Sequence, residues 1–65
     1  MSKETVLQKL REDRNKVSKA IEAMEAAKAV VAETGVAGAY HFASRSIDEL
    51  EKALKEYEDK IRGLE

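Results

Sequence analysis

Few residues in this chain could do acid–base or nucleophilic chemistry. His41 is the only histidine, and Ser44 and Ser46 follow it closely. A histidine that acts as a base needs a nucleophile within hydrogen-bond reach and a second group that orients its ring. The stretch around His41 contains neither a nucleophile-elbow motif nor a paired acid. We therefore interpret His41 as a packing residue or as a residue on the face of a strand.

The carboxylates and the lack of cysteine argue against a metal or cofactor site. The chain has 13 Asp and Glu residues, 12 Lys and Arg residues and no Cys. The carboxylates have basic neighbours at helical spacing, which is typical of a solvated face rather than of a metal site or a glycosidase pair. Without cysteine there is no disulfide scaffold, thiolate ligand or thiol enzyme. We predict no enzymatic activity, no catalytic, metal or cofactor-binding residues, and no small-molecule substrate.

A cluster of basic side chains raises the question of nucleic-acid binding. It consists of Arg11, Arg14, Lys16 and Lys19. Glu12 and Asp13 interrupt the cluster, no aromatic residue is interleaved for base stacking, and the net charge is −1. We predict no specific nucleic-acid binding, whereas non-specific contact with DNA stays open. The Gly35 to Gly38 stretch lacks the lysine of a phosphate loop, so we interpret it as a helix end and a turn.

The first half of the chain carries an apolar stripe with helical spacing. The stripe contains Leu7, Leu10, Val17, Ala20, Ile21, Met24, Ala27 and Val31. Ser2 can cap its start and Gly35 can end it, which predicts a helix over residues 3–34. A polar run from Arg11 to Lys16 weakens the stripe. We interpret this run as a solvated part of one long helix, and the alternative is a break near Asn15.

The last third of the chain has the clearest pattern. Apolar residues alternate steps of three and four along a heptad seam formed by Ile47, Leu50, Leu54, Tyr57, Ile61 and Leu64. Ser46 and Glu49 have the spacing of a capping box directly before it. The pattern predicts a second helix over residues 47–63.

Between the helices the apolar period changes from 3.6 to 2. Val36, Tyr40 and Phe42 would lie on one face of an extended segment, with Ser44 and Arg45 in a turn. We predict a short β segment or minimal β-hairpin within residues 36–45. The pattern does not decide between a hairpin and a single strand that pairs between chains. Such a ribbon is marginal alone and must pack on the helices or pair with another chain.

These elements predict a mainly α protein in which residues 1–65 form one small domain. The two helices are expected to fold back antiparallel, with close approach along an alanine face of Ala20, Ala23, Ala26, Ala27 and Ala29. The first helix is longer, so about 15 Å of it should overhang. Its exposed Val6, Leu7 and Leu10 would then form an N-terminal docking arm over residues 1–14. A chain this small gains little net stability from its own core, which predicts a homo-oligomer.

The sequence contains no apolar run long enough to cross a bilayer, and its first residues do not have the pattern of a signal peptide. We therefore expect no contact with a membrane and a soluble protein of a reducing compartment.

The segment from Tyr40 to Leu50, with Arg45-Ser46 before an apolar residue and an Asp-x-Leu helix rich in Glu and Lys, resembles a known pattern. It is similar to the small head–tail joining proteins of tailed bacteriophages, the gpW-like family. The layout matches over about Ala20 to Leu64 and the motif over Tyr40 to Leu50. This chain departs from the family by having Ala43-Ser44 where the turn usually has glycine, and by a shorter second strand.

The resemblance implies a non-enzymatic structural protein of the virion, assembled in the host cytoplasm. Such a protein would form a ring at the portal vertex, contact portal or other neck and tail proteins, and help to retain packaged DNA. Tyr40, Phe42 and Arg45 would then contribute to contacts between subunits or with the portal. The alternative is a regulatory binding module, such as a dimeric four-helix bundle or an antitoxin-like partner.

Overall fold

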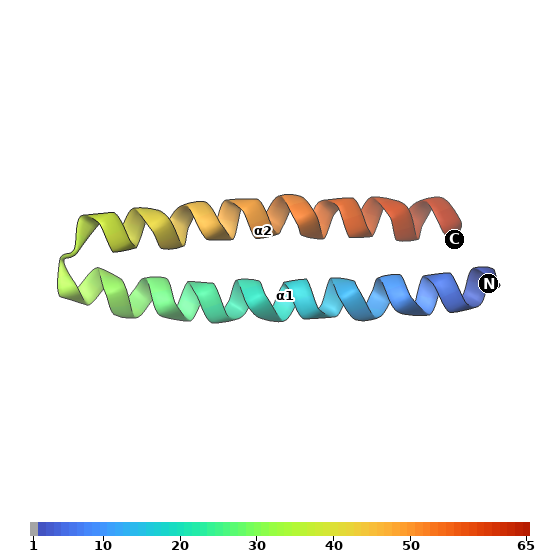
Figure 1. Cartoon of the computed structure of the whole chain (residues 1–65), viewed down its shortest axis with the longest axis horizontal. Helices are drawn as coiled ribbons and strands as arrows, with labels where there is room; N and C mark the ends of the chain where they lie inside the picture. Colours follow the sequence, from blue (N-terminus) through green and yellow to red (C-terminus); the bar gives the residue numbers. More distant parts are fainter. Residues whose placement is uncertain (1) are drawn as a thin grey trace.

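The chain folds as a hairpin of two long helices. The computed structural model describes residues 2–65, in which α1 spans Lys3–Thr34 and α2 spans Ala37–Leu64. The helices run antiparallel and side by side, so that both chain ends lie at one end of a rod and the turn lies at the other (Figure 1). The rod measures 49 × 14 × 14 Å. The predicted antiparallel helical hairpin is confirmed.

The first helix begins and ends where its sequence signals predicted. Ser2 is extended and its hydroxyl accepts a hydrogen bond from the Thr5 amide at 3.2 Å, while Glu4 lies in the positively polarised first turn. The helix continues without a break through the polar run around Asn15. One long helix is therefore correct, and the alternative of a broken helix is wrong.

The turn depends on a single left-handed residue. Gly35 has φ 71°, a conformation that costs a residue with a β-carbon about 1–2 kcal/mol. Thr34 supports the turn with its hydroxyl, which donates to the Val31 carbonyl at 2.7 Å and accepts from the Val36 amide at 3.3 Å. The chain therefore reverses within two residues, Gly35 and Val36.

The second helix is ten residues longer at its start than the sequence predicted. It begins at Ala37, and the Tyr40 amide already donates to the Val36 carbonyl at 3.1 Å. The predicted β segment over residues 36–45 is wrong, as is the start near Ile47, and the structure describes no strand in residues 2–65. Ser46 and Glu49 lie inside the helix and do not form its capping box.

The physical reason lies in where the aromatic segment can bury its side chains. Tyr40 and Ala43 stand seven residues before Ile47 and Leu50, so a helix extends the apolar seam by two positions. Residues 37–45 contain no β-branched side chain and begin with Ala-Gly-Ala, so Tyr40 and Phe42 are the only residues there with a clear preference for a strand. A helix also satisfies the backbone amides that an isolated ribbon would leave unpaired.

Each helix contributes one seam of residues to the core, with steps of three and four. In α1 the seam positions are Leu7, Leu10, Arg14, Val17, Ile21, Met24, Lys28 and Val31. In α2 they are Tyr40, Ala43, Ile47, Leu50, Leu54, Tyr57, Ile61 and Leu64. All are buried or half-buried except Tyr40, which is 38% exposed. Two side-chain contacts join the helices toward the two ends of the rod: Arg11 with Glu65 and Lys28 with Tyr40.

The N-terminal end of α1 extends only slightly past the end of α2 (Figure 1), so the predicted apolar residues of this end do not form an overhang. Arg11 bonds Glu65 at 2.9 Å, and Leu7 is only 8% exposed. Val6 and Leu10 are half-buried. The expectation that Val6, Leu7 and Leu10 have no partner within their own chain is therefore wrong, because the longer α2 reaches these residues. Met1, the first residue of the predicted arm, lies outside the described residues.

The alanine face is also placed differently. Ala23, Ala26, Ala27 and Ala29 are exposed, and only Ala20 is half-buried. The alanines thus flank the seam or point away from it, and larger side chains set the distance between the helices.

The core assignment predicts that truncating two side chains of α2, one on the seam and one exposed, has unequal effects on stability. Ile47 is 7% exposed on the seam, so Ile47→Ala should lower the free energy of unfolding by about 2–5 kcal/mol. Lys55→Ala, at an exposed position, should change it by less than about 0.5 kcal/mol. Thermal and urea unfolding followed by circular dichroism measures both. Equal melting curves for the two variants would contradict the seam.

The glycines predict opposite effects of the same substitution. Gly35→Ala should destabilise the hairpin by about 1–2 kcal/mol, because alanine must then adopt a positive φ. Gly38 lies in the first turn of α2 with open space around its Cα, so Gly38→Ala should stabilise it by up to about 1 kcal/mol. Destabilisation by Gly38→Ala would contradict a helix that starts at Ala37.

Candidate functional site

The surface beside the seam is divided into two flanks of different chemistry. We call the first the charged flank; its positions are Arg11, Ser18, Glu25 and Ala32 on α1 and Ser44, Glu51, Glu58 and Glu65 on α2. Helical spacing places them along one side of the seam, and Arg11 and Glu65 form an ion pair there. Close to the turn this flank is hollowed into an open groove whose lining includes Glu25, Glu51 and Tyr40.

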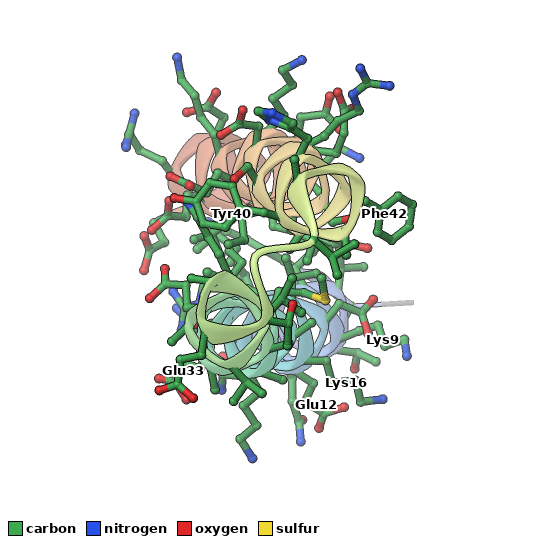
Figure 2. All side chains as sticks on the ribbon, turned by 90° about the vertical axis from the view of Figure 1, so that its left-hand side faces the viewer. Lys9, Glu12, Lys16, Glu33, Tyr40 and Phe42 are labelled. Atoms are coloured by element: carbon green, nitrogen blue, oxygen red, sulfur yellow. The ribbon has the colours of Figure 1, made fainter. Side chains whose placement is uncertain are left out.

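On the opposite side of the seam, the half nearer the turn has almost no bulk. We call this half the small-residue flank; it consists of Ala20, Ala27 and Thr34 on α1 and Ala39, Ser46 and Ala53 on α2. All six are exposed or half-buried. Toward the chain termini the same two columns continue with Val6, Asp13 and Lys60. Viewed along the rod from the turn, Lys9, Lys16 and Phe42 project on one side of the hairpin and Tyr40 lies on the other (Figure 2). Lys9, Lys16 and Phe42 border the small-residue flank, and Tyr40 faces the charged one.

Two basic residues interrupt the apolar seam of α1. Arg14 and Lys28 occupy seam positions and are half-buried. The long side chain of Lys28 lets its aliphatic stem lie at the seam while its ammonium group reaches outward. Its ammonium nitrogen lies 5.1 Å from the centroid of the Tyr40 ring, within the range of a cation–π interaction. This contact joins the two helices close to the turn.

The residues considered for acid–base chemistry do not form a site. His41 is exposed in the second turn of α2, where its ring contacts Tyr40 edge-on at a centroid distance of 6.1 Å. Ser44 and Ser46 are half-buried on opposite flanks. Among residues 2–65, no three His, Asp or Glu side chains are grouped so that they could hold a metal ion.

The basic cluster of α1 is divided between different faces. Arg11 pairs with Glu65, and Arg14 lies at the seam, where it donates to the Asn15 side chain at 3.4 Å. Lys16 and Lys19 project from the other side of the helix by its 3.6-residue period. The cluster therefore does not present one basic surface along the rod.

The residues predicted as interface positions lie at two ends of the molecule. Val6, Leu7 and Leu10 are near the chain termini, and Leu7 is buried within its own chain. Tyr40, Phe42 and Arg45 are near the turn, where Phe42 and Arg45 line one shallow depression with His41 and Gly38. Phe42 is 71% exposed and points away from the hairpin (Figure 2). The structure does not bring the six residues together, and their role as interface residues stays a prediction.

One exposed hydrophobic residue was not predicted from the sequence as a candidate for binding. Val30 is 62% exposed on α1, near the turn. Lys9, Lys16, Ala23 and Val30 are spaced seven residues apart on α1, next to the small-residue flank. This spacing could have indicated from the sequence that Val30 lies outside the seam. With Val36, Tyr40 and Phe42 it is one of four large hydrophobic residues that are exposed in the described part of the chain.

Comparison with protein-family models, with curated proteins and with solved structures finds no match. Neither helix among the described residues is long and apolar enough to cross a membrane. The function has to be argued from the faces of the hairpin.

The Lys28–Tyr40 contact predicts a measurable coupling between the helices. Lys28→Met and Tyr40→Leu each remove one partner while keeping most of the apolar volume. Their double-mutant cycle, measured by urea unfolding, should give a coupling of about 0.5–1 kcal/mol. The pair of Lys55→Met with Tyr40→Leu should be additive, because Lys55 is exposed and far along α2. Additivity in both cycles would contradict the contact.

Proposed function

We propose that this protein is a non-enzymatic assembly component, which acts by packing its helices against other protein chains. The observation that carries the proposal is its exposed area. The hairpin exposes 4906 Å², whereas a compact monomer of 7.3 kDa exposes about 4,200 Å². The surplus comes from the rod shape, in which each helix touches only one other helix.

The composition of the core supports the same proposal. Only five hydrophobic residues are buried in the described chain, and none of the large ones falls below 2% exposure. Burial on this scale barely offsets the ordering entropy of a chain of 65 residues. Association that covers further apolar surface would supply the stability that the hairpin alone lacks.

Two forms of this function are candidates. The first is a head–tail connector of a bacteriophage virion, a ring at the portal vertex that contacts portal or other neck and tail proteins. Its support is the sequence resemblance of Tyr40 to Leu50; these residues are helical here, so the expected strand does not add to it. The second is a small binding or regulatory module that forms a dimeric four-helix bundle, and the bare helical hairpin favours it.

The proposal predicts that stability depends on protein concentration. If association supplies much of the folding free energy, the melting temperature should rise by several degrees over a hundredfold increase in concentration. Native mass spectrometry over the same series gives the stoichiometry: a closed ring of high order favours the connector, and a dimer favours the binding module. A monomer whose melting is independent of concentration, and which keeps a sharp cooperative transition, would contradict self-association as the source of stability.

A further inference from the structure

We propose that two copies of this chain pair through the small-residue flank, with both turns at the same end, to form a four-helix bundle. The inference rests on the proposed function and specifies its partner and its surface. In this pairing α1 of each copy packs antiparallel against α2 of the partner subunit, as it does against α2 of its own chain. The twofold axis runs parallel to the long axis of the rod.

The first argument is the composition of the face. The small-residue flank lets a further helix approach closely, because its six side chains are Ala, Ser or Thr. Beside it run two outer columns with seven-residue spacing. On α1 the column reads Lys9, Lys16, Ala23 and Val30, and on α2 it reads Phe42, Glu49 and Glu56. Phe42 and Val30, at 71% and 62%, are the two most exposed large hydrophobic residues of the described chain.

The second argument is complementarity between the two columns. Val30 and Phe42 lie at similar heights on either side of the turn at Gly35. When the turns are at the same end, Phe42 therefore meets Val30 of the partner subunit. Two heptads further along the rod, Lys16 meets Glu56 of the partner subunit. At these two positions an apolar group faces an apolar group and a charge faces an opposite charge. Between them, Glu49 faces Ala23 of the partner subunit, which neither repels it nor pairs with it.

The reverse orientation lacks this complementarity. If the turns lay at opposite ends, α2 would pack on α2 of the partner subunit. Phe42 would then lie near the acidic end of that helix, and the central Glu49 would approach its own copy. Repulsion between the two Glu49 carboxylates would disfavour this orientation.

The other flank is also excluded on charge. Glu25, Glu51 and Glu58 would approach the same carboxylates of a second copy there. Only Arg11 supplies a positive charge at the flank positions, and it is already paired with Glu65.

The third argument is that the surplus of exposed surface is about as large as the area that a second copy would bury. The hairpin exposes about 700 Å² more than a compact monomer of its mass. A stable interface of standard size buries about 800 Å² per partner, so one copy on this face accounts for the surplus.

Sedimentation equilibrium of the full chain tests the surface. Phe42→Glu should raise the dimer dissociation constant by about tenfold or more, because a charge replaces an aromatic anchor. At protein concentrations above the raised dissociation constant, circular dichroism should be nearly unchanged, since Phe42 touches little of its own chain. Below that concentration the variant should lose stability together with the dimer. His41→Glu is the matched control: it adds the same charge one residue away, on an exposed position outside the face, and should leave the dimer intact.

A charge exchange tests the pairing of Lys16 with Glu56. Lys16→Glu and Glu56→Lys should each weaken the dimer, and the double variant should recover most of the affinity. Recovery is specific to this register, because Lys16 and Glu56 form no ion pair with any other residue among 2–65 of their own chain. Failure of the double variant to recover would overturn the register.

The orientation has a direct measurement, because the chain contains no cysteine. A spin label at Glu33→Cys, next to the turn, should give an interlabel distance well below the 49 Å length of the rod. A distance comparable to that length would overturn the same-end arrangement.

The outcomes separate this inference from the function on which it rests. An oligomer that keeps its mass and affinity in both Phe42→Glu and Lys16→Glu overturns the pairing and leaves the assembly role standing. A wild-type chain that is monomeric and stable at every concentration overturns both.

Discussion

The contact between two heptad seams is the constraint on which the rest of this structure depends. Each seam is a single zigzag row of side chains. Each helix therefore buries a narrow strip of its surface and leaves the surface on both sides of it exposed to solvent. Arg14 and Lys28 weaken the strip further, because a half-buried cation contributes less to the core than leucine would. The side chains beside the seam therefore determine what the molecule can do. One flank is rich in carboxylates, whereas the half of the other side nearer the turn has only small side chains.

Most of the fold could be predicted from the sequence because its signals are local. Ser2 and Gly35 mark both ends of α1, and the repeat from Ile47 to Leu64 marks most of α2. Residues 36–45 were predicted wrongly because Val36, Tyr40 and Phe42 fit a period of two. What decides for a helix is the burial of Ala43 and the contact of Tyr40 with Lys28 of α1, and these become apparent only when the two seams are aligned.

The candidate surface was harder to predict for a related reason. Phe42 was predicted as an interface residue and lies exposed, but Leu7 was predicted with it and is buried in the hairpin. The alanines were placed between the helices, whereas most of them lie outside the seam. A shift of one residue in the assumed heptad moves a side chain to another face of the helix. A residue can therefore be assigned to a face only when the heptad position and the length of both helices are known.

The position of the turn in the middle of the chain has a consequence for how the protein folds. Contacts near Gly35 join residues that are close in sequence, such as Lys28 and Tyr40, whereas Arg11 and Glu65 are 54 positions apart. Loop closure costs more entropy as the sequence separation of the contacting residues grows. Contacts between the helices should therefore form first near the turn and then progressively toward the termini. The region of Val30 and Phe42 then becomes ordered first, and fraying is confined to the opposite end of the rod.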